Sequence, residues 1–147
     1  FIRHSLAPGN GDPAEFILSD CSTQRNLNQK GVSQSKKIGK FFDKNQIPIE
    51  LVLSSEWCRC KDTAFYAFGD FKTFDALNSF YDERFAENED KQIKNLKQYI
   101  NQWNSEKNLV LVTHYVVINS ILGVGSGSGE IIVADKNLIL QGRISEY

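Results

Sequence analysis

The sequence lacks long apolar segments and any excess of charge of one sign. Its longest unbroken apolar run, residues 64–68, has five residues, whereas a membrane-spanning helix needs about 18, so we expect no membrane span. Lysine and arginine together number 17, against 18 aspartates and glutamates. This balance argues against a nucleic-acid-binding protein, because such proteins carry a strongly basic face.

Cysteine is scarce as well, with only three residues at Cys21, Cys58 and Cys60. Any intramolecular disulfide leaves one thiol over, so the count does not decide the redox compartment. A bridge from Cys21 to Cys58 or Cys60 is a candidate if the protein is exported. No leader of basic and apolar residues opens the sequence. Residues 1–4 have the pattern of the end of a strand, and we expect the first part of this strand to be missing from the sequence.

The composition that remains is that of a folded protein. The 147 residues are 41% hydrophobic and 24% charged, which is typical of globular domains rather than disordered or fibrous chains. The length fits a single domain over residues 1–147. Short apolar runs alternate with segments of helical periodicity, and this pattern indicates a sheet covered by helices. The predicted fold class is therefore α/β, a three-layer sandwich with a mainly parallel central sheet.

Apolar and β-branched runs predict six strands, at residues 1–4, 51–54, 72–74, 109–113, 131–134 and 138–140. Helical periodicity and turn residues predict four helices, at residues 31–45, 56–68, 91–103 and 115–122. Ser55 is the expected N-cap of the second helix, since serine side chains accept hydrogen bonds from the first N–H groups of a helix. The polar segment between His4 and Gly31 is too long for an idle connection and is expected to carry function.

Side chains suited to phosphate chemistry follow three of the predicted strands. Arg3 and His4 end the first strand, and His114 ends the strand at residues 109–113. The strand at residues 51–54 leads into a helix whose first turn carries Arg59. In open parallel sheets ligands bind outside the carboxyl ends of the strands, so we expect two imidazoles and two guanidinium groups to share one cleft.

This set of side chains suits a phosphoryl group. The planar fork of arginine matches two phosphate oxygens at once, and the start of the helix near Glu56 would add backbone N–H donors. A neutral imidazole can attack phosphorus and form a phosphohistidine, while the other groups hold the remaining oxygens. The leaving group would then need a proton from a carboxylic acid.

These motifs resemble the histidine phosphatase superfamily, whose phosphoglycerate mutase-like members share an Arg-His motif at the end of the first strand. Arg3-His4 looks like that motif, and residues 24–27 followed by Gly31 look like the loop before the family's first helix. Residues 54–64 are similar to the family's second arginine motif, and Thr113-His114 to its second histidine. The resemblance covers roughly residues 1–123 and implies a phosphoglycerate mutase-like fold.

The resemblance implies a role for each of these residues. His4 would be the phosphorylated nucleophile, and Arg3, Arg59 and His114 would form the phosphate pocket. Arg25 would either bind phosphate or tie its loop to the domain.

The implied activity is that of a phosphatase acting on a phosphorylated small molecule or a phosphoprotein. We expect no metal or cofactor, because the arginines would supply the positive charge. Similarity to a small bacterial branch of the family suggests a periplasmic or secreted location, and a cytoplasmic one stays open.

Three carboxylic acids are candidates for the proton donor. Glu83 resembles the acid of mutase-like members, and Asp20 lies where short phosphohistidine phosphatases carry an acid. Asp12 is the third candidate. A useful donor needs a pKa raised by burial or by a neighbouring carboxylate, and the sequence does not choose among the three.

Two departures from the family pattern keep other functions open. Ser5 and Tyr115 stand where glycines usually follow the two histidines, and both would add bulk beside the pocket. One alternative is therefore a phosphate-binding module with weakened catalysis, and another is a protein phosphohistidine phosphatase in signalling. Hydrolysis is favoured over mutase action, since few residues are left to hold a phosphorylated acid and to exclude water.

Overall fold

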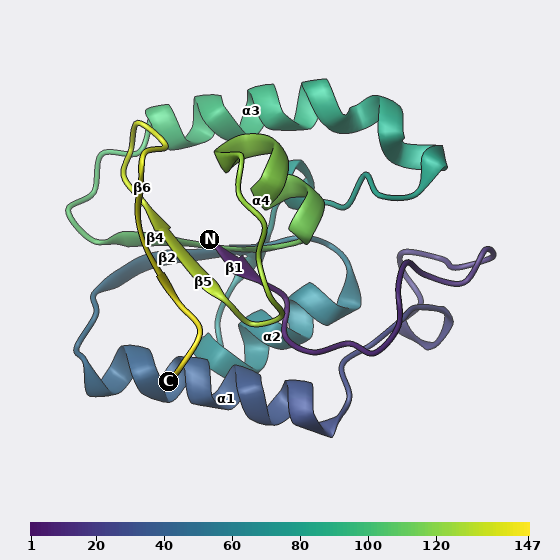
Figure 1. Ribbon diagram of the computed structural model, residues 1–147, viewed down its shortest axis with the longest axis horizontal. Coiled ribbons are helices and arrows are strands. Elements are labelled where there is room, and N and C mark those ends of the chain that lie inside the picture. The colour runs from purple at the N-terminus through teal and green to yellow at the C-terminus, as the bar shows by residue number, and fades with distance from the viewer.

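The computed structural model describes the whole chain, Phe1–Tyr147, and has a six-stranded sheet at its centre (Figure 1). The strands are β1 Ile2–Arg3, β2 Ile49–Ser54, β3 Lys72–Thr73, β4 Asn108–Thr113, β5 Ile131–Ala134 and β6 Leu140–Ile144. Their order in the sheet is β3-β2-β4-β1-β5-β6. The first four of these run parallel, whereas β5 and β6 are antiparallel to their neighbours. The predicted, mainly parallel α/β sheet is therefore confirmed, with an antiparallel hairpin at one edge.

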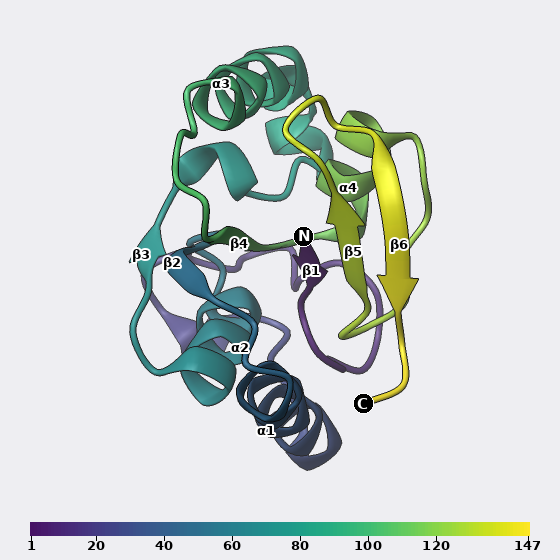
Figure 2. The ribbon, with the colours of Figure 1, turned by 90° about the vertical axis from the view of Figure 1, so that its left-hand side faces the viewer.

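Four α-helices cover the two faces of the sheet, which gives the expected three layers (Figure 2). They are α1 Gln29–Lys44, α2 Cys58–Phe68, α3 Glu89–Asn101 and α4 Tyr115–Leu122. α1 and α2 lie together on one face, and α3 and α4 lie on the other. Short 3₁₀ helices occupy Cys21–Thr23, Asp75–Leu77 and Glu83–Asn88. None of the helices combines the length and the apolar character required to span a membrane.

Each face of the sheet has its own apolar core, because side chains alternate between the faces along a strand. Leu53 and Leu111 point to the side of α3 and α4, whereas their neighbours Val52 and Val110 point to the side of α1 and α2. α1 and α2 pack closely at Gly39 because glycine has no side chain. A Cβ atom at this position would collide with the carbonyl oxygen of Ala67. The two cores fix the sheet between the helical layers.

The structure shifts three of the four predicted helix starts and leaves the one at residue 115 as predicted. α1 begins at Gln29, two residues early, because the side chain of Asn28 accepts a hydrogen bond from the N–H of Gly31 at 2.9 Å. α2 begins at Cys58 rather than residue 56, so the expected N-cap role of Ser55 is wrong. α3 begins at Glu89, also two residues early.

The predicted strand at residues 138–140 is also wrong, since β6 begins at Leu140. Leu138 has a φ of 63° and lies in a turn. The carboxylate of Asp135 stabilises that turn by accepting hydrogen bonds from the backbone N–H groups of Asn137 and Ile139. β6 is an edge strand with mostly exposed side chains, so its sequence has no apolar run to mark it.

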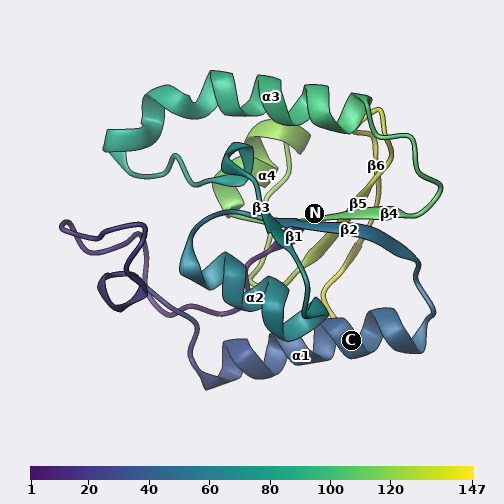
Figure 3. The ribbon, with the colours of Figure 1, turned by 180° about the vertical axis from the view of Figure 1, so that it is seen from behind.

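The loop after β1 projects from the side of the molecule and leads into α1 (Figure 3). A disulfide joins Cys21 in this loop to Cys58, the first residue of α2. The side chain of Gln24 adds a second tie, since its oxygen accepts from the N–H of Cys58 at 3.0 Å. Cys60 is the free thiol and is buried. The loop is therefore held against the start of α2, one residue from Arg59.

Candidate active site

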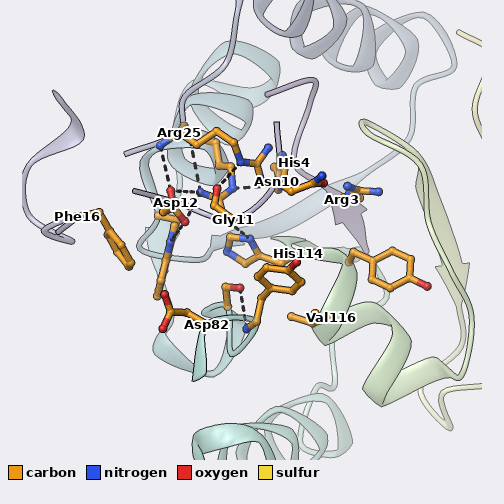
Figure 4. Close-up of a pocket in the computed structure, with 15 residues that line it drawn as sticks. Arg3, His4, Asn10, Gly11, Asp12, Phe16, Arg25, Asp82, His114 and Val116 are labelled. Carbon is orange, nitrogen blue, oxygen red and sulfur yellow. Dashed lines mark hydrogen bonds and ion pairs between the residues drawn. The ribbon is translucent and has the colours of Figure 1, made fainter. Parts of the chain in front are cut away.

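A pocket of about 180 Å³ opens where the carboxyl ends of β1 and β4 meet the start of α2 (Figure 4). Its lining combines basic, acidic and aromatic side chains. The lining residues are Arg3, His4, Asn10, Gly11, Asp12, Phe16, Arg25, Trp57, Arg59, Ser79, Tyr81, Asp82, His114, Tyr115 and Val116. The structure thus brings the two imidazoles and the three predicted arginines together around one cavity.

His4 is buried at the end of β1, and one of its two ring nitrogens is unprotonated. Its Nδ1 lies 2.8 Å from the carbonyl oxygen of Ser5, which can only accept, so Nδ1 carries the proton. Nε2 then holds the lone pair, and the Nε of Arg59 donates to it at 3.3 Å. Burial, followed by the charge of Arg59, places the pKa of His4 well below its usual value. His4 is therefore a neutral imidazole at neutral pH.

His114 follows β4 and faces His4, with the ring centroids 5.5 Å apart. Its Nδ1 lies 3.4 Å from Nη2 of Arg59, which can only donate, so the proton sits on Nε2. Nε2 then donates to the hydroxyl of Ser55 at 2.9 Å, and that hydroxyl donates to Oδ1 of Asn78 at 3.2 Å. Burial and the charge of Arg59 also place the pKa of His114 well below its usual value.

Arg59, in the first turn of α2, is the centre of the site and is only 3% exposed. One edge of its guanidinium group, formed by Nε and Nη2, faces the unprotonated nitrogens of the two histidines. Its remaining nitrogen, Nη1, binds the carboxylate of Asp12 at 2.9 and 3.1 Å. The edge that faces the histidines is the one that can bind two oxygens of a phosphoryl group.

Arg3 and Arg25 complete the positive charge of the pocket in different ways. Arg3 donates from Nη1 to the carbonyl of Ser126, and its Nε is buried with no hydrogen-bond partner. Arg25 donates from Nε to the carbonyl of Gly11 at 2.6 Å and from Nη1 to that of Ala7. Arg25 therefore both ties its loop and lines the pocket, so the two roles expected for it do not exclude each other.

The backbone N–H groups just before and at the start of α2 are largely engaged within the protein. The N–H of Glu56 donates to Asn78, the N–H of Trp57 to Ser55, and the N–H of Cys58 to Gln24. These hydrogen bonds are internal to the protein. The N–H groups of these three residues are therefore not available to a phosphoryl group, and the arginine side chains supply donors at this end of the pocket.

Neither of the two main candidates for the proton donor lines the pocket. Asp20 is exposed and caps the 3₁₀ helix Cys21–Thr23, accepting from the N–H and the hydroxyl of Ser22. Glu83 is exposed and begins the 3₁₀ helix Glu83–Asn88. The structure therefore does not bring either carboxylate to the pocket that holds His4.

The carboxylates that do line the pocket are those of Asp12 and Asp82. Asp82 sits at the mouth and binds Arg84 through both oxygens, and these hydrogen bonds hold its pKa at about 2. Asp12 accepts hydrogen bonds from Arg59, from Trp57 Nε1 and from the backbone of Arg25. Asp12 was predicted only as the third candidate for the proton donor, and Asp82 was not predicted as a site residue.

The two residues expected to crowd the pocket behave differently. Ser5 is fully buried outside the pocket, and its hydroxyl accepts from Ser35 of α1 at 2.8 Å. Tyr115 does line the mouth, where the guanidinium group of Arg3 lies 5.6 Å from its ring centre. The expectation of added bulk is therefore wrong for Ser5, whose side chain points toward α1. Nowhere in the structure do three or more His, Cys, Asp or Glu side chains gather as ligands for a metal ion.

Comparison with known proteins gives matches in structure only. No protein-family model and no curated protein matches the sequence. A phosphoglycerate mutase from Thermus thermophilus superposes with a TM-score of 0.68 at 15% identity, covering 99% of this chain and 97% of that chain. The chain has the phosphoglycerate mutase-like fold.

Two further solved structures support the same conclusion. The protein histidine phosphatase SixA, complexed with tungstate, superposes with a TM-score of 0.66 at 16% identity, covering 98% of this chain and 94% of that chain. TTHB049, also from Thermus thermophilus, gives a TM-score of 0.62 at 15% identity, covering 82% of this chain and 85% of that chain. These proteins belong to the histidine phosphatase superfamily, so the predicted resemblance is confirmed at the level of the fold.

Proposed function

We propose that the protein is a phosphatase that hydrolyses a phosphomonoester or a phosphoramidate through a phosphohistidine intermediate on His4. The geometry of Arg59 is the observation that carries this proposal. Its Nε and Nη2 lie 3.3 and 3.4 Å from the unprotonated nitrogens of His4 and His114. A phosphoryl group bound between them would meet the lone pair of His4 and two fixed donors at once.

The reaction would proceed in two displacements. First, the lone pair on Nε2 of His4 forms a bond to phosphorus while the bond to the leaving oxygen or nitrogen breaks, and the leaving atom takes a proton from water. Then a second water attacks phosphorus and gives up a proton, which neutralises the hydroxide left by the first step, and the bond between phosphorus and Nε2 breaks with its electrons returning to the imidazole. Inorganic phosphate leaves, and Arg59 stabilises the charge on the equatorial oxygens in both steps.

Hydrolysis is favoured over mutase action by the charge at the mouth. The basic side chains of the lining are Arg3, Arg25 and Arg59 with the two histidines. Arg59 serves the phosphoryl end of the pocket, Arg25 also ties its loop, and Arg3 lies against Tyr115 at the mouth. Arg3 is therefore the single arginine of the outer lining, which otherwise has aromatic and small polar side chains and Asp82, and this favours a substrate with one phosphoryl group over one with a second acidic group.

The pocket has no carboxylic acid placed to protonate a leaving group. This favours a leaving group that takes up a proton readily by itself. The lining carboxylates are held as hydrogen-bond acceptors, Asp12 by Arg59 and Asp82 by Arg84. An alkoxide leaving group needs a positioned acid, whereas the ring nitrogen of a phosphohistidine takes a proton near neutral pH. Of the two substrate classes, phosphoramidates such as phosphohistidine are therefore favoured, and this supports the second candidate, a protein phosphohistidine phosphatase.

The test compares the wild type with His4→Ala on an aryl phosphate, on a phosphohistidine peptide and on glycerol phosphate, each with a chelator present. We expect turnover of the first two substrates, weak turnover of the third, and none by His4→Ala. Rapid quenching should trap acid-labile phosphate on the wild type only. A wild type that binds tungstate but hydrolyses none of these substrates would instead identify the phosphate-binding module.

A further inference from the structure

Asp12, in the loop after β1, has a fully satisfied carboxylate at the back of Arg59. The side chain is only 7% exposed and forms an ion pair with Arg59. Oδ1 accepts from Nη1 of Arg59 at 2.9 Å and from the backbone N–H of Arg25 at 3.0 Å. Oδ2 accepts from Nη1 of Arg59 at 3.1 Å and from Nε1 of Trp57 at 3.1 Å. Each oxygen thus receives two donors.

These contacts fix the rotation of the guanidinium plane. The carboxylate holds Nη1, on the side of the group away from the imidazoles, so the edge formed by Nε and Nη2 has to face His4 and His114. Figure 4 shows Asp12 beside Arg25, on the side of the pocket opposite Arg3. The carboxylate is itself held by Trp57 and by the backbone of Arg25, so it cannot follow the guanidinium group if that group turns.

We propose that Asp12 is a positioning residue that orients Arg59 for the transferred phosphoryl group, and not a proton donor. The inference rests on the proposed phosphatase function. A carboxylate that accepts four hydrogen bonds has no proton to give in this geometry. Its contribution is to keep two N–H groups aimed where the charge of the transition state develops, which is the kind of preorganisation on which catalysis depends.

Asp12→Asn is the sharp substitution because it keeps the shape and removes one acceptor. In either orientation the amide NH₂ points at N–H groups that previously met an oxygen, those of Arg59 with either Arg25 or Trp57. The side chain can no longer hold Arg59 as before. At the same time the pocket loses one negative charge, which by itself favours binding of an anion.

The experiment measures kcat and KM for an aryl phosphate and the inhibition constant of inorganic phosphate. Asp12→Asn is expected to lower kcat about 100-fold, as a displaced catalytic group does, while phosphate binds as tightly as before or more tightly. Asp20→Asn is the matched control, since this carboxylate also accepts backbone and side-chain hydrogen bonds in the same loop but lies outside the pocket. Its kcat should stay within about twofold of the wild type, as expected for an exposed substitution.

Two results with Asp12→Asn would overturn the inference. An unchanged kcat in Asp12→Asn means that Arg59 needs no such support, and a parallel loss of kcat and phosphate binding means that Asp12 only holds the loop. If Asp12→Asn does not fold, Trp57→Phe removes one donor to Oδ2 and should lower kcat about threefold to tenfold at constant phosphate affinity, and no change overturns the inference. A wild type as inactive as His4→Ala would overturn the proposed function itself, which separates the two failures.

Discussion

The floor of the pocket and its mouth are built from different parts of the chain and have opposite properties. The floor consists of His4, Arg59 and His114, which are 2%, 3% and 3% exposed and follow or begin regular elements. The mouth includes Tyr81 and Tyr115, which are 63% and 44% exposed. The floor is rigid and basic, so it can determine the phosphoryl chemistry. The mouth is exposed and mainly aromatic, with Arg3 against the ring of Tyr115, so it can vary with the leaving group.

The largest predicted effect falls on the floor, in the variant Arg59→Lys. Lysine keeps the charge but loses the two parallel N–H groups that face the histidines. We expect kcat/KM for an aryl phosphate to fall by about 3–4 kcal/mol in transition-state stabilisation, comparable with the loss of an oxyanion donor. Steady-state kinetics with the wild type and the variant at the same pH measures this directly.

Arg143→Lys is the control for Arg59→Lys. Arg143 lies on β6 and also binds a carboxylate through Nε and Nη2, that of Glu130 at 2.8 and 2.9 Å, but it does not line the pocket. Its activity should equal that of the wild type. Full activity in Arg59→Lys would show that the floor needs only a positive charge. It would contradict the role given to the paired N–H groups of Arg59.

The difference between floor and mouth also explains what the sequence could predict. Arg3, His4 and His114 follow strands that run parallel, and parallel strands bring their carboxyl ends to one edge, so their meeting could be predicted without coordinates. The same reasoning placed Arg59 beside them. The fold class followed from the alternation of apolar runs and helical periodicity, because buried parallel strands leave that pattern.

The positions of the loop side chains could not be predicted, because loops have no periodic sequence pattern like that of a helix or a strand. Asp20 and Glu83 are acidic residues in plausible positions, but one caps a 3₁₀ helix and the other starts one. The hydroxyl of Ser55 looked like a helix cap and instead accepts from His114, from another strand end. The bounds of β6 were not predicted, because this edge strand is largely exposed and has no apolar run in its sequence.

The next largest effect concerns the disulfide that holds the loop after β1 against the start of α2. The bridge from Cys21 to Cys58 joins the loop carrying Asp12 to the helix carrying Arg59, across 37 residues of sequence. Its loss should lower the free energy of unfolding by about 2–4 kcal/mol, because the unfolded chain gains freedom. Denaturation with and without a reductant measures the loss. Cys60→Ala should stay sensitive to the reductant and Cys21→Ser should lose this sensitivity; equal behaviour of the two would contradict the assigned pairing.

A smaller loss of stability is expected when the pH is lowered, and it comes from the two histidines of the floor. The folded state holds the pKa of both His4 and His114 well below 6.5, so below pH 6.5 the unfolded state binds more protons than the folded state. Stability is therefore lost as the pH falls below about 6.5, by up to about 1.4 kcal/mol per pH unit for each imidazole. The carboxyl of Asp82 at the mouth, with its pKa held at about 2, does not change charge in this window.

The imidazole contribution can be isolated by comparing variants. The slope of unfolding free energy against pH, taken from urea denaturation between pH 7 and 5, should therefore be smaller in His114→Gln than in the wild type. Identical slopes would mean that His114 is not held neutral in the folded protein.

The smallest effect is predicted at the mouth, where Tyr81→Ala removes an exposed ring. The side chain is 63% exposed and touches none of the groups on the floor, so stability should change by about 0.5 kcal/mol or less. With a small aryl phosphate, kcat should stay within about threefold, a difference of roughly 0.6 kcal/mol. With a phosphohistidine peptide, whose flanking residues must cross the mouth, KM should rise while kcat is kept. A loss of kcat on both substrates would mean that the mouth takes part in phosphoryl transfer, and the division between floor and mouth would no longer hold.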